Sequence, residues 1–307
     1  MYDIVIIGAG PAGLSAAVNT SFLKLTSVVI DDTQAGGALI QAYPWKKVDY
    51  FGFYEVSGKE LAEIFVEHAR KNGVEIIEGE EALDIKKLDE GFEVITTKNS
   101  YKGKTVVLAT GIIGTPRHLN VKGEDLEGIY YYLKDPEGYR GKKVLVVGGG
   151  DSAVENATAL SLNGAEVYVA HRRDEFRAMV KNQERLFKTN AKIFWNTEVK
   201  EFVGNKKVEE VILFNNKTGE EFELEVDNVF IFIGSVLKKE FFQRLGIEME
   251  GNFVKVNKDF MTNIPGVFAI GDITPGIKRI SKAVYEGEAV AFSIFKFLKN
   301  PYWGKND

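Results

Sequence analysis

The sequence predicts an α/β fold of two similar domains, and two observations carry the prediction. The first is that two apolar segments, residues 3–7 and 143–147, each run into closely spaced glycines and then into small residues. The second is their spacing, because Gly148 lies 140 positions after Gly8. A buried strand that turns through glycines into a small-residue helix is typical of a nucleotide-binding βαβ unit. We therefore expect two Rossmann-like domains.

The first glycine loop has the spacing of a dinucleotide-binding turn. Its first two glycines allow a tight turn close to a pyrophosphate, the third allows close packing of helix on strand, and the helix start offers N–H groups to phosphates. The next strand, residues 27–30, ends in two acids, where a ribose hydroxyl needs an acceptor. The alternative is a turn explained by packing alone. The candidate residues here are Gly8, Gly10, Pro11, Ala12, Gly13, Asp31 and Asp32.

A loop, a helix and a meander are expected next. Residues 33–44 are glycine-rich and then aromatic, which indicates either a loop pressed on a flat group or an ordinary turn with a surface tyrosine. Residues 57–72 predict an amphipathic helix capped by Ser57. Three short strands, at 82–86, 92–96 and 104–108, return the chain to the first site. The candidate residues are Gly37, Gln41, Tyr43, Thr110 and Gly111.

The second unit differs from the first at the end of its second strand. Residues 166–170 are followed by a basic segment instead of two acids. Arginine is a planar, bidentate donor that matches a phosphate, so the segment predicts NADP(H), whose ribose carries a 2′-phosphate. The alternative is a solvated basic helix start. The candidate residues of this unit are Gly148, Gly150, Asp151, Ser152, Ala153, His171, Arg172, Arg173, Arg177 and Gly234.

The last part of the chain predicts a return to the first site. A second meander, residues 197–224, leads into an apolar strand that ends at Gly234, as the first meander led into Gly111. Residues 263–273 then contain a short buried strand that ends in Gly271 and Asp272, before a helix at about 281–298. We expect Asp272 to accept a hydrogen bond from a cofactor hydroxyl.

Composition excludes several classes of site. The chain has 307 residues, 45% of them hydrophobic, and a net charge of −5, so neither disorder nor nucleic-acid binding is expected. No membrane span or signal peptide is expected, which favours the cytoplasm. With no cysteine and three histidines, a metal site and a thiol nucleophile are not expected.

Five basic residues have two alternative interpretations. They either steer an acidic electron carrier to the protein or form an ordinary solvated surface. The residues are Lys46, Lys47, Lys278, Arg279 and Lys282.

Taken together, these motifs resemble the low-molecular-weight thioredoxin reductase family of flavoproteins. The similarity lies in both glycine loops, in the basic segment from His171 to Arg177, and in Gly271 with Asp272. It implies three-layer ββα domains, with FAD in the first and NADPH in the second. It also implies that the NADPH domain is inserted in the FAD domain, with boundaries at 1–115, 116–238 and 239–307, and that the protein is a homodimer.

The chain departs from that family where a redox-active Cys-x-x-Cys is expected. Those two positions fall on Tyr131 and Lys134, so the sequence is similar to the cysteine-free branch, the thioredoxin-reductase-like ferredoxin–NADP reductases. Local matches at residues 36–44, 49–53 and 132–135 support the branch. The resemblance implies flavin-based chemistry with no catalytic side chain and with ferredoxin or flavodoxin as partner. The alternatives are a flavin reductase or oxidase with a small-molecule acceptor, and a non-catalytic redox sensor.

The flavin ring has two faces, and an aromatic side chain is expected to stack on each. The resemblance implies that Tyr43 stacks on one face. For the other face we expect Tyr302 or Trp303, from the segment after the last helix, either in the same chain or in a dimer partner. The alternative is a frayed end whose aromatic residues pack on their own domain.

Overall fold

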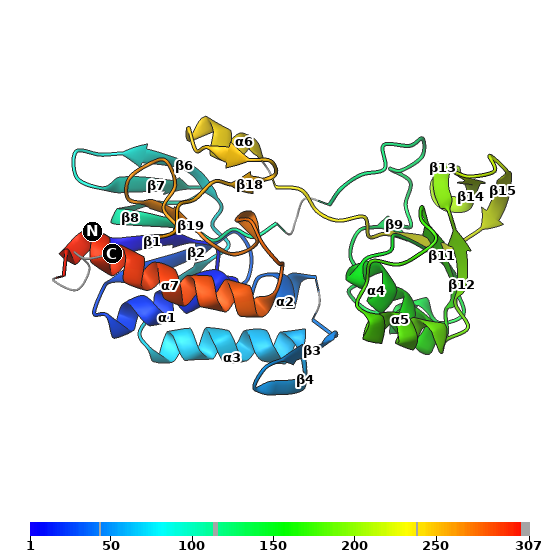
Figure 1. Cartoon of the computed structure of the whole chain (residues 1–307), viewed down its shortest axis with the longest axis horizontal. Coiled ribbons are helices and arrows are strands. Elements are labelled where there is room, and N and C mark those ends of the chain that lie inside the picture. Colours follow the sequence, from blue (N-terminus) through cyan, green and yellow to red (C-terminus); the bar gives the residue numbers. More distant parts are fainter. Residues whose placement is uncertain (43, 113–115, 238, 302–307) are drawn as a thin grey trace. The chain divides into compact units, whose positions relative to one another are not determined.

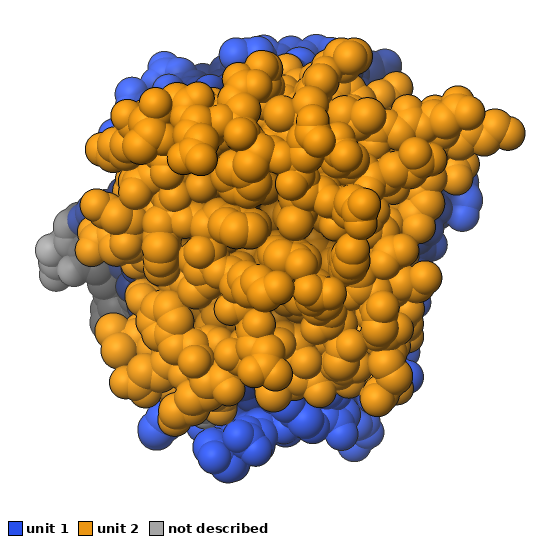
Figure 2. Space-filling view, turned by 90° about the vertical axis from the view of Figure 1, so that its right-hand side faces the viewer, with its two compact units in different colours: residues 1–115, 236–307 blue, residues 116–235 orange. Residues whose placement is uncertain are grey.

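The computed structural model describes residues 1–42, 44–112, 116–237 and 239–301, with only the backbone at residue 49. The chain divides into two compact units: unit 1 contains residues 1–115 and 236–307, and unit 2 contains residues 116–235 (Figure 2). Unit 2 therefore lies within unit 1 in the sequence. No helix among the described residues is both long and apolar enough to cross a membrane.

The main sheet of unit 1 is built around β1 (Tyr2–Ile7), which runs parallel to β2 on one side and β8 on the other. The first residues of β8 pair antiparallel with β7, whereas its last residues pair parallel with β1 and β19. This one strand thus joins the parallel sheet to the meander. The strand order is β5-β2-β1-β8-β7-β6, with β19 paired to β8. The strands of this sheet other than β1 are β2 (Ser27–Asp31), β5 (Glu75–Glu78), β6 (Ala82–Lys87), β7 (Phe92–Thr96), β8 (Ser100–Leu108) and β19 (Val267–Ala269).

Three helices cover one face of this sheet (Figure 1): α1 (Pro11–Phe22), α3 (Gly58–Lys71) and α7 (Ile280–Lys299). Alternate residues of β1 point to opposite faces of the sheet. Ile4 and Ile6 pack in the apolar cluster that includes the helices, whereas Val5 and Ile7 pack in the cluster that includes the meander and α6. The remaining elements of unit 1 are α2 (Ala38–Gln41), β3 (Lys47–Tyr50), β4 (Phe53–Ser57), α6 (Lys239–Arg244), β17 (Met249–Glu250), β18 (Phe253–Val254) and the short 3₁₀ turn η2 (Gly271–Ile273).

Unit 2 repeats the plan with a parallel sheet ordered β12-β11-β10-β16-β9 and a separate antiparallel sheet, β13-β14-β15. The apolar cluster of the unit joins the parallel sheet to the antiparallel one. Its elements are β9 (Ile129–Tyr130), η1 (Glu137–Tyr139), β10 (Lys143–Val147), α4 (Asp151–Leu162), β11 (Glu166–His171), α5 (Val180–Phe187), β12 (Lys192–Trp195), β13 (Thr197–Gly204), β14 (Val208–Asn215), β15 (Glu221–Glu225) and β16 (Asn228–Ile231).

The repeat predicted from the glycine spacing is confirmed in the backbone pairing. The Gly8 N–H donates to the Ile30 carbonyl at 2.7 Å, and 140 positions later the Gly148 N–H donates to the Ala170 carbonyl at 3.0 Å. Both units are Rossmann-like. The expected cap of α3 is also confirmed, because Ser57 and Glu60 form a capping box. Two details differ: β8 is longer than expected, and the glycine-rich loop contains the short helix α2.

Candidate functional site

The first glycine loop is shaped by close backbone packing. Gly8 has φ +108°, and a Cβ there would overlap the carbonyl oxygen of Ala109, at the end of the neighbouring strand. A Cβ at Gly13 would overlap the carbonyl oxygen of Gly8. Any larger side chain at either position would push helix, strand and loop apart. These two glycines therefore position the start of α1 at the edge of the sheet.

The start of α1 offers polar N–H groups beside a second close approach. Its N-cap residue is Gly10, no side chain caps the first turn, and no acidic residue lies there. The loop that carries Gly37 comes so near that a Cβ on Gly37 would lie 2.8 Å from the Gly10 Cα. A helix start with uncapped N–H groups and glycines around it suits an anionic group such as a pyrophosphate. The predicted residues Pro11 and Ala12 lie in this first turn.

The two acids at the end of β2 differ in their surroundings. Asp31 is buried, and its carboxylate accepts hydrogen bonds from the Ala9 N–H at 2.7 Å and the Thr33 N–H at 3.0 Å. Burial raises the pKa of this carboxyl above its ordinary value, although these bonds act against the rise. Asp32 is exposed. Asp31 thus ties the glycine loop to the loop after β2, and Asp32 is the acid that faces outward.

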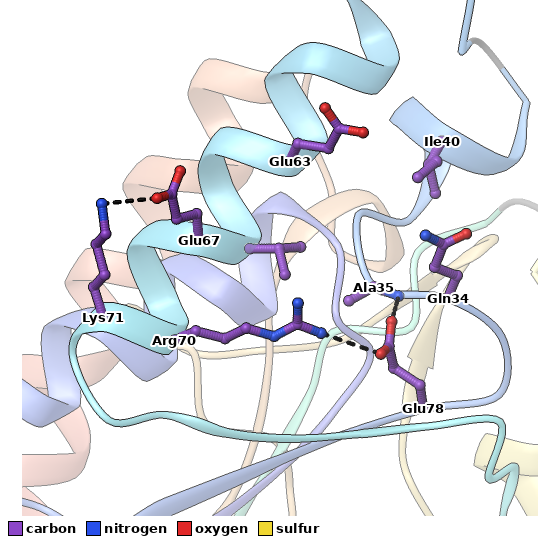
Figure 3. Close-up of a pocket in the computed structure, with 9 residues that line it drawn as sticks. Gln34, Ala35, Ile40, Glu63, Glu67, Arg70, Lys71 and Glu78 are labelled. Carbon is purple, nitrogen blue, oxygen red and sulfur yellow. Dashed lines mark hydrogen bonds and ion pairs between the residues drawn. The ribbon is translucent and has the colours of Figure 1, made fainter.

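A hydrogen bond and an ion pair of Glu78, together called the relay, hold the loop after β2 (Figure 3). Glu78, the last residue of β5, accepts a hydrogen bond from the Ala35 N–H at 2.8 Å and pairs with the Arg70 guanidinium of α3 at 3.2 Å. The predicted residue Gln41 also contributes, since its amide donates to the Thr33 hydroxyl. The relay borders a pocket of about 530 Å³, lined by Gln34, Ala35, Ile40, Glu63, Val66, Glu67, Arg70, Lys71 and Glu78.

The turn η2 carries Gly271 and Asp272, for which the sequence predicts a return to the first site. A Cβ on Gly271 would lie 3.0 Å from the Cβ of Ala12, so the turn lies against the first turn of α1. Burial raises the pKa of the Asp272 carboxyl. Among the described residues no hydrogen bond to this carboxylate is found, which leaves it available to a hydroxyl donor. Thr110 and Gly111 follow the end of β8. A Cβ on Gly8 would lie 3.0 Å from the Thr110 Cα, and a Cβ on Gly111 would meet open space.

These features fit the dinucleotide expected in unit 1. Glycines lie where side chains would block close approach, uncapped N–H groups lie at the start of α1, and the partly buried Asp272 carboxylate accepts no hydrogen bond from the residues that the structure describes. The structure also corrects one expectation about charge. Lys282 is not a surface residue that steers a partner, because its side chain is only 11% exposed and pairs with Glu286.

In unit 2 the second glycine loop has the same geometry and a cationic neighbour. A Cβ on Gly148 would overlap the Phe232 carbonyl oxygen, and α4 begins after Gly150 with no side-chain cap. A Cβ on Gly150 would lie 3.7 Å from the Arg177 guanidinium. The side chains of Arg172, Arg173 and Arg177 are exposed, and none of the three guanidinium groups has a partner in the described part of the chain.

Two other predicted residues of unit 2 serve the loop itself. The His171 imidazole packs on the Cα of Gly149 and against the rings of Phe176 and Trp195, and it is only 9% exposed. Burial, together with the nearby arginine charges, lowers the pKa of this imidazole. Asp151 accepts hydrogen bonds from the Met179 N–H and the Asn182 amide, which ties α4 to the start of α5. Ser152 and Ala153 lie in the first turn of α4, and Gly234 is exposed with φ +102°.

Tyr131, which the sequence resemblance places at one of the two expected cysteine positions, belongs to a polar cluster. Its hydroxyl lies 2.8 Å from the Glu124 carboxylate and 2.8 Å from the His118 Nδ1. Burial and the Glu124 charge raise the pKa of this phenol. Three ring-stacking candidates, Tyr43, Tyr302 and Trp303, lie outside the described residues. Within those described, no cluster of metal-ligating side chains occurs.

Sequence reasoning missed the side chains that hold the loops rather than a ligand. Glu78, Lys282 and Glu286 belong to this group. One of them carried a signal, because Glu286 interrupts the otherwise apolar or small stripe of α7 that contains Ala283, Gly287 and Val290. A charged residue on a buried helix face needs a partner, and Lys282 stands one turn before it.

Comparison with known proteins identifies the family. Residues 2–287 match the model of the pyridine nucleotide-disulphide oxidoreductase family. Proteins named ferredoxin–NADP reductase from Ignicoccus hospitalis and Metallosphaera sedula are each 37% identical, over 99% and 98% of this chain and 100% and 94% of their own lengths. The crystal structure of Lactococcus lactis thioredoxin reductase matches with a TM-score of 0.90 at 32% identity, over 98% of this chain and all of that one. The chain, which has no cysteine, belongs to the pyridine nucleotide-disulphide oxidoreductase family.

Proposed function

We propose that this oxidoreductase binds FAD in unit 1 and NADP(H) in unit 2 and transfers electrons between NADP(H) and a one-electron carrier, a ferredoxin or a flavodoxin. The observation that supports the proposal is that both glycine loops have glycines where a Cβ would overlap a neighbouring carbonyl oxygen, in a chain with no cysteine. Without cysteine there is no mixed disulfide through which electrons reach a disulfide substrate. The ferredoxin–NADP reductase names of two relatives support the choice of acceptor.

The division of labour follows from the residues present. A bound flavin supplies the ability to exchange a hydride with nicotinamide and single electrons with a carrier. The chain supplies binding and orientation: the N–H groups of α1 for the pyrophosphate, Asp32 and Asp272 for hydroxyls, and Arg172 with Arg177 for the 2′-phosphate of NADPH. No side chain is assigned an acid or base role. We also propose that the protein acts as a homodimer, which its mass in solution tests.

The test is an anaerobic assay of the purified protein. We expect one FAD per chain, NADPH-dependent reduction of cytochrome c only when a ferredoxin or flavodoxin is added, and a rate that falls with added salt if charge steers the carrier. Thioredoxin and disulfide dyes should not be reduced.

Other results lead to other functions. Efficient turnover of quinone, free flavin or oxygen, with no response to any carrier in the panel, indicates a flavin reductase or oxidase. A flavin that stays oxidised under excess NADPH indicates a sensor.

A further inference from the structure

Lys282 and Glu286 form a buried ion pair one turn apart on α7. Their side chains are only 11% and 8% exposed, and the ammonium lies 3.0 Å from the carboxylate. Moving two charges out of water is costly, and their attraction offsets the cost only if further hydrogen bonds satisfy both groups. The further hydrogen bonds of Lys282 and Glu286 therefore identify the groups that the pair holds in place.

Those contacts converge on Gly271, the first residue of η2. The Glu286 carboxylate accepts the Gly271 N–H at 2.6 Å, and the Lys282 ammonium donates to the Gly271 carbonyl at 2.7 Å. Thr274 lies between them, since its hydroxyl accepts from Lys282 at 2.8 Å. Gly271 has φ +78°, a conformation that its neighbours must hold in place. The two opposite charges thus contact both backbone polar groups of one glycine, and its carbonyl also accepts hydrogen bonds from the N–H and the hydroxyl of Thr274.

The helix that carries the pair is itself fixed against α1. A Cβ on Gly287 would lie 2.5 Å from the Ala12 carbonyl oxygen, so the two helices touch backbone to backbone beside Glu286. The Ser15 hydroxyl donates to the Val284 carbonyl at 2.7 Å and locks the contact. The pair therefore relates η2 to the helix that follows the first glycine loop.

The residue next to Gly271 is Asp272, whose carboxylate has no hydrogen-bond partner among the described residues. Burial raises the pKa of this carboxyl, the Lys278 and Lys282 charges lower it, and the Glu286 charge raises it. The direction in which this carboxylate points depends on the backbone of Gly271, because the two residues share a peptide bond.

We propose that Lys282 and Glu286 are positioning residues of the FAD site: by fixing Gly271 they hold the Asp272 carboxylate where it accepts a hydrogen bond from a hydroxyl group of the bound nucleotide. The proposal rests on the FAD assigned to unit 1 in the proposed function and is independent of the electron acceptor. The pair itself need not touch the nucleotide.

The test is a titration of the FAD-free protein with FAD, followed by flavin fluorescence. Lys282→Met should raise the Kd for FAD about tenfold, because the Gly271 carbonyl loses its charged donor and Glu286 stays buried without a partner. The matched control is Lys278→Met, which removes another positive charge near Asp272 from an exposed position and should change the Kd less than threefold. Equal effects of the two variants would mean that charge alone matters and would overturn the proposal.

A second variant separates positioning from folding. Replacement of a buried ion pair by apolar residues often leaves stability unchanged or improves it, so Lys282→Met with Glu286→Leu should give a folded protein. We expect its unfolding temperature without FAD to match that of the unmodified protein while its Kd for FAD is raised about tenfold. An unchanged Kd would overturn the proposal, because the pair would then not position the FAD site.

A double-mutant cycle locates the effect. If the pair acts through Asp272, combining Lys282→Met with Asp272→Asn should weaken FAD binding by less than the product of the two separate factors. Independent factors would overturn the proposal. Failure of the proposed function has a different signature: FAD binds and responds to the variants as expected, yet no carrier is reduced.

Discussion

Asp31 and His171 occupy the same place in the two units, 140 positions apart at the ends of β2 and β11. Each contacts the middle residue of its own glycine loop. The Asp31 carboxylate accepts a hydrogen bond from the Ala9 N–H, and the His171 ring packs against Gly149. A short carboxylate leaves room for the Ala9 methyl group, whereas an imidazole does not leave room for one on Gly149. The identity of each loop residue thus follows from the strand end beside it.

The first prediction concerns Gly149→Ala. The added methyl group would overlap the His171 ring, so we expect a loss of about 1–3 kcal/mol of stability and weaker NADPH binding, with FAD content unchanged. Thermal unfolding and NADPH titration measure the two effects. Adding His171→Ala to Gly149→Ala should restore much of the lost stability, and no restoration would show that the ring is not the obstacle.

A second prediction follows from the pKa of His171. Burial lowers it in the folded chain below the ordinary 6.5, so the unfolded chain takes up the proton first as pH falls. Stability from this residue is present above pH 6.5 and is lost as pH drops below that value. We expect the difference in unfolding temperature between pH 7.5 and pH 5.5 to shrink in His171→Asn, and an undiminished difference would show that His171 does not carry this pH dependence.

The third prediction concerns nucleotide choice. Arg172→Ala with Arg177→Ala should remove most of the preference for NADPH over NADH while leaving NADH use nearly unchanged, because each charged hydrogen bond contributes about 1.5–3 kcal/mol. Steady-state rates with both nucleotides measure the preference. An unmodified protein that uses both nucleotides equally well would contradict the NADPH assignment itself.

At the scale of elements, the loop between β2 and α2 is held by strand β5 and the residues after it. Besides the bond from Ala35 to Glu78, the Gly79 N–H donates to the Thr33 carbonyl at 2.9 Å. These two hydrogen bonds therefore hold the loop that contains Gly37 near the start of α1, and they do not require a bound ligand. This preorganisation reduces the ordering cost of binding.

The fourth prediction tests that loop. Glu78→Ala leaves the N–H of the buried residue Ala35 without its acceptor, which costs about 1–3 kcal/mol, and should speed the loss of FAD on dilution. Glu67→Ala is the matched control, since Glu67 lies on the same pocket and pairs with Lys71 at the exposed surface (Figure 3). Equal rates of FAD loss in both variants would show that the relay does not hold the loop.

The strand–turn–helix elements that occur in both units could be predicted from the sequence. The side-chain contacts that occur in only one unit could not. The 140-residue spacing predicted both glycine turns, since a strand, a tight turn and a small-residue helix are encoded locally. The burial of Lys282 was not predictable from its neighbours, because it depends on the loop of residues 274–279, where a Cβ on Gly276 would lie 3.0 Å from the Lys282 side chain. The engagement of Asp31 by Ala9 likewise appears only once strand and loop are paired.

At the scale of the whole molecule, unit 2 is one continuous stretch with its own core. Its apolar cluster joins Leu145 and Val229 of the parallel sheet to Val211 and Leu213 of the antiparallel sheet, all within residues 116–235. Unit 1, by contrast, needs residues from both sides of that stretch. The two units therefore differ in what each requires in order to fold.

The fifth prediction is that residues 116–235, produced alone, fold cooperatively and bind NADP⁺ with an affinity within about tenfold of that of the full chain. Circular dichroism on heating and calorimetric titration are the measurements. A fragment with Arg172→Ala and Arg177→Ala should fold equally well and bind more weakly. A fragment that stays unfolded would show that unit 2 depends on unit 1.

The backbone contact between α1 and α7 at Gly287 also sets an order of events during synthesis on the ribosome. The chain of unit 2 has left the ribosome before residues 280–299 are made, and domains tend to fold as they emerge. The first glycine loop, made at the very start, must wait for α7 before Gly271 and Asp272 can be placed beside it. Under the proposed assignment of the nucleotides, a nascent chain completes the NADP(H) unit early and the FAD site last, so we expect premature termination before residue 280 to yield a product without flavin colour.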